Sequence, residues 1–236
     1  MDSKPSIGER LTWWRIALLR LHSQTSLEAH LYPLLKLNVL FRPYEKRDFD
    51  ACLDIYLKNE PGRFPEGYSS EFTRYLEEDQ KSLIIAELNS RVVGYGGINL
   101  MGPNVASLCY GIIDPEFQGQ RIGATLVLLR IAQLTADRDG VYVLIFAVDA
   151  SIPIYNQFGF SERGKWKTED GKDHPLGVLH VSQSSLERIK SVLKRRRVEV
   201  RGKLIVRISG KSVCEVQHGA YGSRFVFSPR EETSSQ

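Results

Sequence analysis

The sequence predicts an α+β fold in which helices flank one mixed, mostly antiparallel sheet. Three successive apolar stretches between residues 82 and 113 are separated only by turn residues, which predicts an antiparallel meander. Stretches with apolar residues at helical spacing lie before and after this meander. Residues 141–148 form a continuous apolar run, typical of a strand covered on both faces. With 236 residues, 42% of them hydrophobic, the chain can bury one full core.

The part of the chain before the meander predicts a helical segment, a strand and two helices. Residues 1–36 have apolar side chains three and four positions apart and form a predicted helical extension. The next elements are a strand over residues 39–44 and helices over 48–57 and 70–79. Between these two helices, residues 58–67 are rich in turn-forming residues and are expected to form a loop.

The meander and the elements after it complete the predicted sheet. Its strands are expected over residues 82–88, 92–101 and 105–113. The helix expected over residues 124–136 should be largely buried, because most of its side chains are apolar. The remaining expected elements are a strand over 141–148, a short helix over 152–158, a strand from residue 160 and a strand over 176–181.

Positive charge is concentrated near the C-terminal end. Residues 188–211 contain ten basic side chains and one acid, a formal charge of +9, whereas the whole chain carries +4. We therefore divide the chain into a helical extension (1–36), a main domain (37–183) and a basic extension (184–236) with short strands and a polar tail. A helix is expected over residues 184–197, with Leu186, Ile189 and Leu193 facing the main domain. Its basic face is either a solubilising surface or a binding site for RNA or another polyanion.

Cysteine content and hydropathy exclude several classes of protein. Cys52, Cys109 and Cys214 are far apart and odd in number, so no disulfide framework is expected and a reducing, cytoplasmic compartment is favoured. No residues show metal-ligand spacing, so no metal is expected. No apolar run approaches the roughly 20 residues that span a bilayer, and the most apolar N-terminal stretch is interrupted by Arg15 and Arg20.

The stretch from Ile113 to Ala124 contains the most informative motif. It leads from the end of a predicted strand through a turn into a helix. The first turn of a helix presents N–H groups without intrahelical partners at the positive end of the helix dipole. Because Gly119 and Gly123 carry no side chain, a pyrophosphate can approach this backbone closely. The pattern is neither a P-loop nor a GxGxxG fingerprint.

Two motifs in this order resemble the GCN5-related N-acetyltransferase (GNAT) superfamily. They are Ile113-x-Pro115-x-x-Gln118-Gly119-Gln120-Arg121-Ile122-Gly123-Ala124 and, after an apolar strand, Ile154-Tyr155-Asn156-Gln157-Phe158-Gly159-Phe160. The family pattern is Gln/Arg-x-x-Gly-x-Gly/Ala, followed later by Tyr-x-x-x-Gly-Phe. The resemblance covers about residues 38–183 and implies a GNAT-like fold. Residues 58–66 are also similar to one branch of the superfamily, through Asn59, Pro61, Phe64 and Pro65.

The resemblance implies a binding mode for acetyl-CoA. The backbone amides that would hold its pyrophosphate are those of Gln118, Gly119, Gln120, Arg121, Ile122, Gly123 and Ala124. The pantetheine arm would lie between the strand that ends at Ile113 and the strand over residues 141–148. An amide near Gly111 or Ile112 would hold the thioester oxygen as negative charge develops. Tyr155 corresponds to the tyrosine that protonates the departing thiolate, a task that suits a phenol.

The sequence departs from the family pattern at two positions. Arg121 replaces the central glycine of the signature, and its side chain is a candidate phosphate contact. Asp149 is the nearest polar match to an asparagine common at the end of the following strand, and it is a candidate cofactor contact. Cys109 and Tyr110 are expected on opposite faces of their strand, so that only one of them faces the acceptor cleft.

An acceptor amine must lose a proton before it attacks, and a carboxylate is the usual base. Glu60 and Glu66 lie in the stretch that borders the acceptor in this family, and they are the main candidates. Asp149 and Glu116 are further candidates, while each acid is also explained as a solvated surface residue.

The predicted function is direct transfer of an acetyl group from acetyl-CoA to an amine, with both substrates bound at once. The acceptor stays open among small amines, antibiotics, peptide N-termini, lysines and aminoacyl-tRNA. Two alternatives stay open as well. One is a non-catalytic, regulatory acyl-CoA-binding module, and the other is a nucleic-acid-associated protein that acts through its basic extension.

Overall fold

The computed structural model describes most of the chain from residue 38 to residue 229. The described residues are 38–63, 68–78, 82–136, 139–146, 151–167, 173–204, 206–208, 212–219 and 222–229. The predicted helical extension over residues 1–36 lies outside them, as do Glu66, Asp149 and the polar tail after residue 229.

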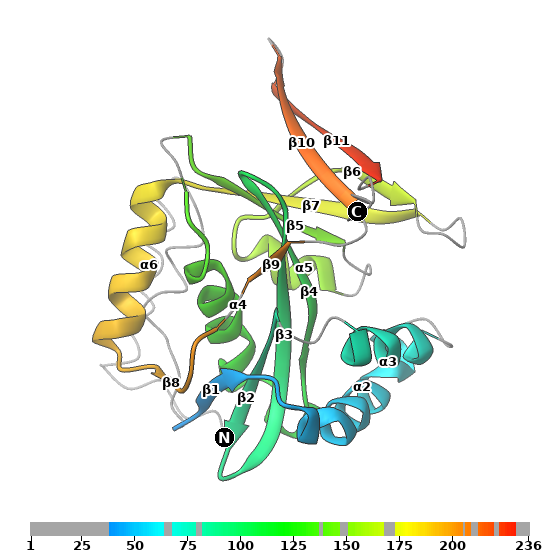
Figure 1. Cartoon of the computed structure of the whole chain (residues 1–236), viewed down its shortest axis with the longest axis vertical. Helices are drawn as coiled ribbons and strands as arrows, with labels where there is room; N and C mark the ends of the chain where they lie inside the picture. The colour runs from blue at the N-terminus through cyan, green and yellow to red at the C-terminus, as the bar shows by residue number, and fades with distance from the viewer. Residues whose placement is uncertain are drawn as a thin grey trace, which may run out of the picture.

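The described residues form a nine-stranded sheet and a separate two-stranded hairpin (Figure 1). The order in the sheet is β6-β7-β5-β4-β3-β2-β1-β8, and β9 pairs with β3. The strands are β1 (Leu40–Pro43), β2 (Leu83–Leu88), β3 (Arg91–Gly102), β4 (Val105–Ile113), β5 (Val141–Phe146), β6 (Ser161–Lys167), β7 (Asp173–Val181), β8 (Glu199–Val200) and β9 (Arg207–Ile208). Pairing is antiparallel except for the pairs β4–β5, β1–β8 and β3–β9. The predicted α+β class, with a mixed and mostly antiparallel sheet, is confirmed.

Helices cover both faces of this sheet. They are α2 (Phe49–Arg63), α3 (Ser69–Glu78), α4 (Ile122–Ala132), α5 (Ile152–Asn156) and α6 (Gln183–Arg195), with short 3₁₀ turns η2 (Lys46–Asp48) and η4 (Pro115–Phe117). Figure 1 shows α4 and α6 on one side of the strands and α2 and α3 on the other. In the described part of the chain, no helix is long and apolar enough to cross a membrane.

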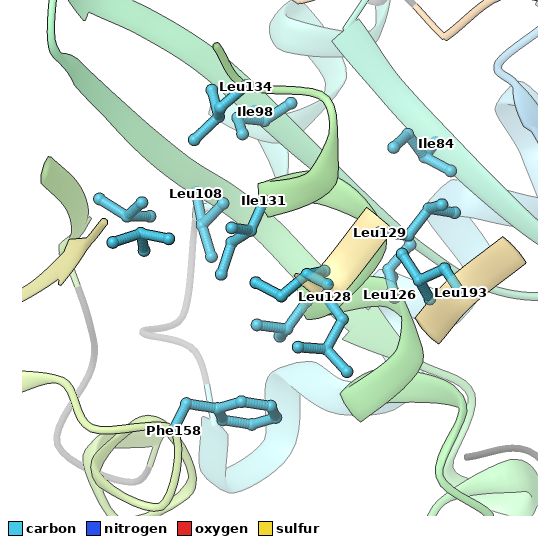
Figure 2. Close-up of a cluster of buried hydrophobic side chains, with 14 of the residues drawn as sticks. Ile84, Ile98, Leu108, Leu126, Leu128, Leu129, Ile131, Leu134, Phe158 and Leu193 are labelled. Atoms are coloured by element: carbon cyan, nitrogen blue, oxygen red, sulfur yellow. The ribbon is translucent and has the colours of Figure 1, made fainter. Parts of the chain in front are cut away.

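The main hydrophobic core lies between the sheet and the helices α4 and α6. Figure 2 shows Leu126, Leu128, Leu129 and Ile131 of α4 in one cluster with Ile84, Ile98 and Leu108 of the sheet. The helix α4 is largely buried, as its apolar sequence predicts. In α6 the buried side chains are Leu186, Ile189, Val192 and Leu193. The prediction that this helix packs on the main domain is therefore confirmed.

On the opposite face, α2 and α3 pack on the sheet through aromatic rings. Phe72 of α3 stacks on Tyr56 of α2, with 4.8 Å between the ring centroids, and on Tyr95 of β3, with 5.4 Å. Such rings contribute large buried areas and hold the two helices against the central strands.

The hairpin of β10 (Ser212–Gly219) and β11 (Gly222–Pro229) packs on a third apolar cluster. Cys214 is fully buried there beside Met101, Val105 and Leu144. The ring of Phe225 lies 5.3 Å from that of Tyr142, measured between centroids. The short strands predicted in the basic extension are therefore present, and they take part in burying the sheet.

The prediction of a loop from residue 58 is wrong, because α2 continues to Arg63. Asn59, Glu60 and Pro61 are turn-forming or polar residues, but they lie in the last turns of this helix. The Asn59 side chain is fixed by its surroundings, since its amide donates hydrogen bonds to the carbonyls of Ile55 and Ile113. Tertiary contacts of this kind override the weak local preference of the sequence.

Candidate active site

The strands β4 and β5 pair along only part of their length. Their pairing runs from Val105↔Tyr142 to Leu108↔Ile145, whereas β4 continues to Ile113. Beyond Leu108, β4 therefore has no β5 partner among the described residues. The resemblance to the GNAT superfamily implies that the pantetheine arm lies between these two strands.

The strand β4 contains a bulge within this unpaired part. Tyr95 of β3 pairs with Ile112 and Gly97 with Cys109, so Gly96 alone lies opposite Tyr110 and Gly111. Tyr110 has a φ of 45°, in the left-handed region that a tyrosine rarely adopts. A bulge leaves backbone groups without ladder partners and redirects side chains, as sites that bind a reacting carbonyl require.

The expectation that Cys109 and Tyr110 lie on opposite faces of the strand is wrong. The Cys109 thiol lies 3.7 Å from the Tyr75 hydroxyl of α3, and the rings of Tyr110 and Tyr75 are 4.5 Å apart. Both side chains thus contact the same residue of the same helix. The extra residue in the bulge breaks the two-residue period on which the expectation rested.

The Tyr155 hydroxyl lies beside the bulge. It is 3.2 Å from the position that a β-carbon on Gly111 would occupy. The half-buried Tyr155 ring packs edge-on against Phe160, with 5.4 Å between the centroids. The tyrosine that the resemblance singles out and the bulge in β4 therefore lie together.

A buried arginine that the sequence analysis missed lies at the same point. Arg130 of α4 is 1% exposed, and its guanidinium donates hydrogen bonds to the carbonyls of Gly97 (3.2 Å) and Cys109 (3.3 Å). A third bond goes to the carbonyl of Leu126 (3.3 Å) in its own helix. One sequence signal could have revealed it, because Arg130 is a charged residue inside the apolar run of α4.

The loop before α4 has the features expected of an anion-binding helix start. Gly119 and Arg121 both have left-handed φ angles, of 76° and 68°, and no side chain caps the helix that begins at Ile122. Among the residues that the structure describes, a β-carbon on Gly119 would meet no atom within 4 Å, and one on Gly123 would meet only Ile113, at 3.4 Å. The space over these glycines is open, which fits the close approach of a phosphate to the backbone.

Buried polar residues hold this loop in place. Gln118 donates to the Asn59 side chain (3.1 Å) and to the carbonyl of Ile113 (3.0 Å), so the loop is tied to α2 and to the end of β4. Asp114 is 1% exposed, accepts a hydrogen bond from the Glu116 N–H, and forms ion pairs with Arg91 and Lys58. Burial opposes ionisation of Asp114, but this N–H and these cations outweigh it and lower the pKa of its carboxyl.

The candidate bases have different surroundings. Glu60 is half-buried, and its Oε1 is buried without a hydrogen-bond partner among the described residues. Burial, together with the charges of Glu60 and Glu71, raises the pKa of Tyr56 to about 12. Glu116 is largely exposed and forms an ion pair with Arg91 (2.6 Å), so it belongs to a surface pair.

Comparison with known proteins extends this picture. Residues 49–160 match the model of the family described as Acetyltransferase (GNAT) family. An acetyltransferase of the GNAT family from Staphylococcus aureus Mu50 superimposes with a TM-score of 0.50 at 14% identity, over 60% of this chain and 98% of that chain. No curated protein sequence matches the chain.

Two further solved structures are similar over 61% of this chain. One is the ribosomal-protein-S18-alanine N-acetyltransferase from Escherichia coli, with 19% identity, a TM-score of 0.47 and 94% of its own length covered. The other is a GNAT family acetyltransferase from Brucella melitensis in complex with acetyl-CoA, with 18% identity, a TM-score of 0.46 and 88% covered.

The fold and the helix-start loop define an α+β protein with an open, glycine-containing loop next to a bulged strand. The family comparison makes the class more specific: residues 49–160 match the acetyltransferase (GNAT) family, and the resemblance seen in the sequence is confirmed.

Proposed function

We propose that this chain is an N-acetyltransferase that moves an acetyl group from acetyl-CoA directly to an amine while both substrates are bound. One observation carries the proposal. The Tyr155 hydroxyl lies beside Gly111 in the bulge of β4. The same strand ends at Ile113, which lies 3.4 Å from the position that a β-carbon on Gly123 would occupy at the open helix start. The loop from Gln118 to Ala124, the strand β4 and the Tyr155 hydroxyl therefore follow one another along one path.

Along this path, each part of acetyl-CoA has a candidate partner. The backbone amides from Gln118 to Ala124 bind the pyrophosphate, and Arg121 adds a cation. The pantetheine arm lies along the part of β4 that has no β5 partner, including Ile112 and Ile113. A bulge amide N–H near Gly111 or Ile112 donates a hydrogen bond to the thioester oxygen as its negative charge grows. Asp149, which lies outside the described residues, stays a candidate contact.

The reaction needs two proton transfers. The neutral amine attacks the thioester carbonyl carbon, a C–N bond forms, and the C–S bond breaks. Tyr155 gives its proton to the departing thiolate, and a carboxylate takes the proton that the amine nitrogen loses. Glu60 is one candidate for this base, because its half-buried carboxylate has an oxygen without a partner among the described residues. Glu66, outside the described residues, is the other.

The substitution Tyr155→Phe tests the proton donor. It keeps the ring and its packing on Phe160 but removes the hydroxyl, so we expect turnover to fall roughly 10²-fold or more while acetyl-CoA affinity is unchanged. Turnover is measured as thiol release from acetyl-CoA with a panel of small amines, peptides and lysine side chains. Tyr142→Phe is the control, because its ring lies at the hairpin contact with Phe225. Wild-type turnover in Tyr155→Phe would show that the Tyr155 hydroxyl does not act in catalysis and that the ring serves only in packing.

The same assay separates the catalytic proposal from the regulatory alternative. A regulatory module would bind acetyl-CoA, measured by calorimetry, but release no thiol with any amine in the panel.

We propose, second, that the basic extension binds a polyanion such as RNA. The observation that favours it is exposure, since Lys194, Arg195, Arg196, Arg197 and Arg201 are all exposed around the end of α6. Affinity for RNA should fall steeply between about 50 and 200 mM salt, because each neutralised phosphate releases counterions. Replacing Arg195, Arg196 and Arg197 by Ser should weaken this binding without changing acetyl-CoA affinity. An absence of RNA retention at 50 mM salt would contradict the proposal.

A further inference from the structure

Two arginines in the described part of the chain are almost fully buried, and their partners differ. Arg42 is 5% exposed and forms ion pairs with Asp48 and Glu87. Arg130 is 1% exposed, and its hydrogen bonds go only to backbone carbonyls, with no carboxylate partner among the described residues. A buried charge without a counter-ion is costly. Arg130 therefore needs an explanation other than fold stability.

The guanidinium of Arg130 lies against the bulge of β4. β-Carbons on Gly96 and on Gly111 would each lie 3.0 Å from guanidinium atoms, so these two glycines leave the space that it fills. Its Nη1 donates to the carbonyls of Gly97 and Cys109, which pair with each other next to the bulge. Arg130 thus ties β3 to β4 at the point where β4 is distorted.

The side of the guanidinium that makes no hydrogen bond to the described residues faces the candidate reaction centre. Nη2 of Arg130 lies 3.0 Å from the β-carbon position of Gly111, and the Tyr155 hydroxyl lies 3.2 Å from the same point. The cation and the proton donor therefore meet on the same face of the same bulge residue.

We propose that Arg130 is a positioning residue for acetyl transfer. It fixes the shape of the bulge and holds a permanent positive charge beside the thioester, where negative charge develops first on the carbonyl oxygen and then on the sulfur. Inside a protein such a preorganised charge acts more strongly than in water. This inference rests on the proposed acetyltransferase function. It adds that the charge in α4, as well as a backbone amide and Tyr155, contributes to the rate.

Two substitutions at Arg130 separate charge from packing. Arg130→Met keeps an unbranched side chain of similar length and removes the charge, whereas Arg130→Lys keeps the charge and loses the planar fork. The matched control is Arg42→Lys, which perturbs the other buried arginine away from the bulge. For each protein, thiol release gives kcat and the KM for acetyl-CoA, calorimetry gives acetyl-CoA affinity, and thermal unfolding gives the midpoint.

We expect Arg130→Met to lose about 10²-fold in kcat, the effect of removing one preorganised donor, with acetyl-CoA affinity close to that of the wild type. Its unfolding midpoint should fall only modestly, because removal of a costly buried charge offsets part of the loss of three hydrogen bonds to backbone carbonyls. Arg130→Lys should recover part of the kcat, and Arg42→Lys should keep wild-type kcat. Full kcat in Arg130→Met would overturn the inference. Equal losses of kcat in Arg130→Met and Arg130→Lys, with lowered unfolding midpoints in both, would show that Arg130 has a purely structural role. That result would also overturn the inference.

A spectroscopic measurement makes the test independent of the acceptor. Acetyl-CoA labelled with ¹³C at the acetyl carbonyl is bound to each protein without an amine, and its carbonyl resonance is recorded. A positive charge beside the thioester polarises the carbonyl, so its resonance should move downfield on the wild type and less on Arg130→Met. An equal shift on both proteins would overturn the role of Arg130 alone. A wild type that neither binds acetyl-CoA nor releases thiol would instead overturn the proposed function and this inference with it.

Discussion

Arg121 has a backbone conformation that normally belongs to glycine. Its φ of 68° places it in the left-handed region, at the position where the family signature has its central glycine. The sequence shows that arginine stands at this position. The structure shows that its backbone still adopts the left-handed conformation that glycine favours. A residue with a β-carbon in this region costs about 1 kcal/mol or more.

Replacing Arg121 by glycine should relieve this strain. We expect Arg121→Gly to be more stable than Arg121→Ala by about 1 kcal/mol, because alanine keeps the β-carbon. Urea unfolding of both variants checks this value. Both lack the cation, so any loss of acetyl-CoA affinity that they share measures the phosphate contact of the side chain. Equal stability of the two variants would contradict the strain argument.

Asp114 makes stability depend on pH. Because the pKa of its carboxyl is lowered in the folded protein, the folded state binds this proton less readily than the unfolded state does. Its contribution is therefore complete above the ordinary pKa of about 3.9 and is lost as the pH falls through the lower folded value. We expect the wild type to lose more unfolding free energy than Asp114→Asn as the pH falls below about 4, measured by urea unfolding at each pH.

At neutral pH, Asp114→Asn should cost about 1–3 kcal/mol, as for other buried hydrogen bonds to a charged group. Glu116→Gln is the matched control, because Glu116 pairs with the same Arg91 but is largely exposed. The unfolding free energy of Glu116→Gln should fall by no more than about 1 kcal/mol, the usual range for surface ion pairs. If both variants lost the same stability, burial of Asp114 would not explain its effect.

At the scale of elements, a substitution at the start of α4 should change acetyl-CoA binding without weakening the fold. The β-carbon of a residue at position 123 has room, since it meets only Ile113 at 3.4 Å. An acid in the first turn of a helix also interacts favourably with the helix dipole. We therefore expect Gly123→Glu to keep or raise the unfolding midpoint while it abolishes acetyl-CoA binding, measured by calorimetry. The smaller Gly123→Ala should keep more of the affinity, whereas undiminished affinity in Gly123→Glu would contradict the phosphate loop.

The docking of the β10–β11 hairpin depends on a glycine at the end of β3. A β-carbon on Gly102 would overlap the backbone carbonyl of Cys214, so Gly102→Ala should lift the hairpin from the sheet. Burial raises the pKa of the Cys214 thiol to about 11, so this thiol should react slowly in the wild type. We expect faster alkylation of Cys214 in Gly102→Ala, followed by mass spectrometry, with the buried Cys52 as an internal reference. Unchanged alkylation would contradict the docking contact.

Regular elements were predictable because each has a simple periodic signal. The three meander strands and the buried helix α4 lie where apolar patterning puts them, and Tyr155 and the loop from Gln118 follow from motifs. The bulge at Tyr110 was not predictable from the two-residue period, since an extra residue in one strand has no signal of its own. Arg130 was missed because its partners, Gly97 and Cys109, are distant in sequence.

At the scale of the whole molecule, the C-terminal part of the chain is built into the sheet. The strand β8 pairs with β1, β9 pairs with β3, and α6 packs in the same core as α4. The division into a main domain over residues 37–183 and a basic extension over 184–236 stays a prediction. The contacts show that much of this extension covers apolar surface, a role that its positive charge does not indicate.

The late position of these covering elements has a consequence for synthesis on the ribosome. Chains emerge at about 5–20 residues per second, so the apolar surface around Met101 and Leu144 is complete long before β10 and β11 are made to cover it. During this interval the nascent chain exposes a sheet face that the finished protein buries. This third apolar cluster is therefore completed only after the residues of β10 and β11 have left the ribosome.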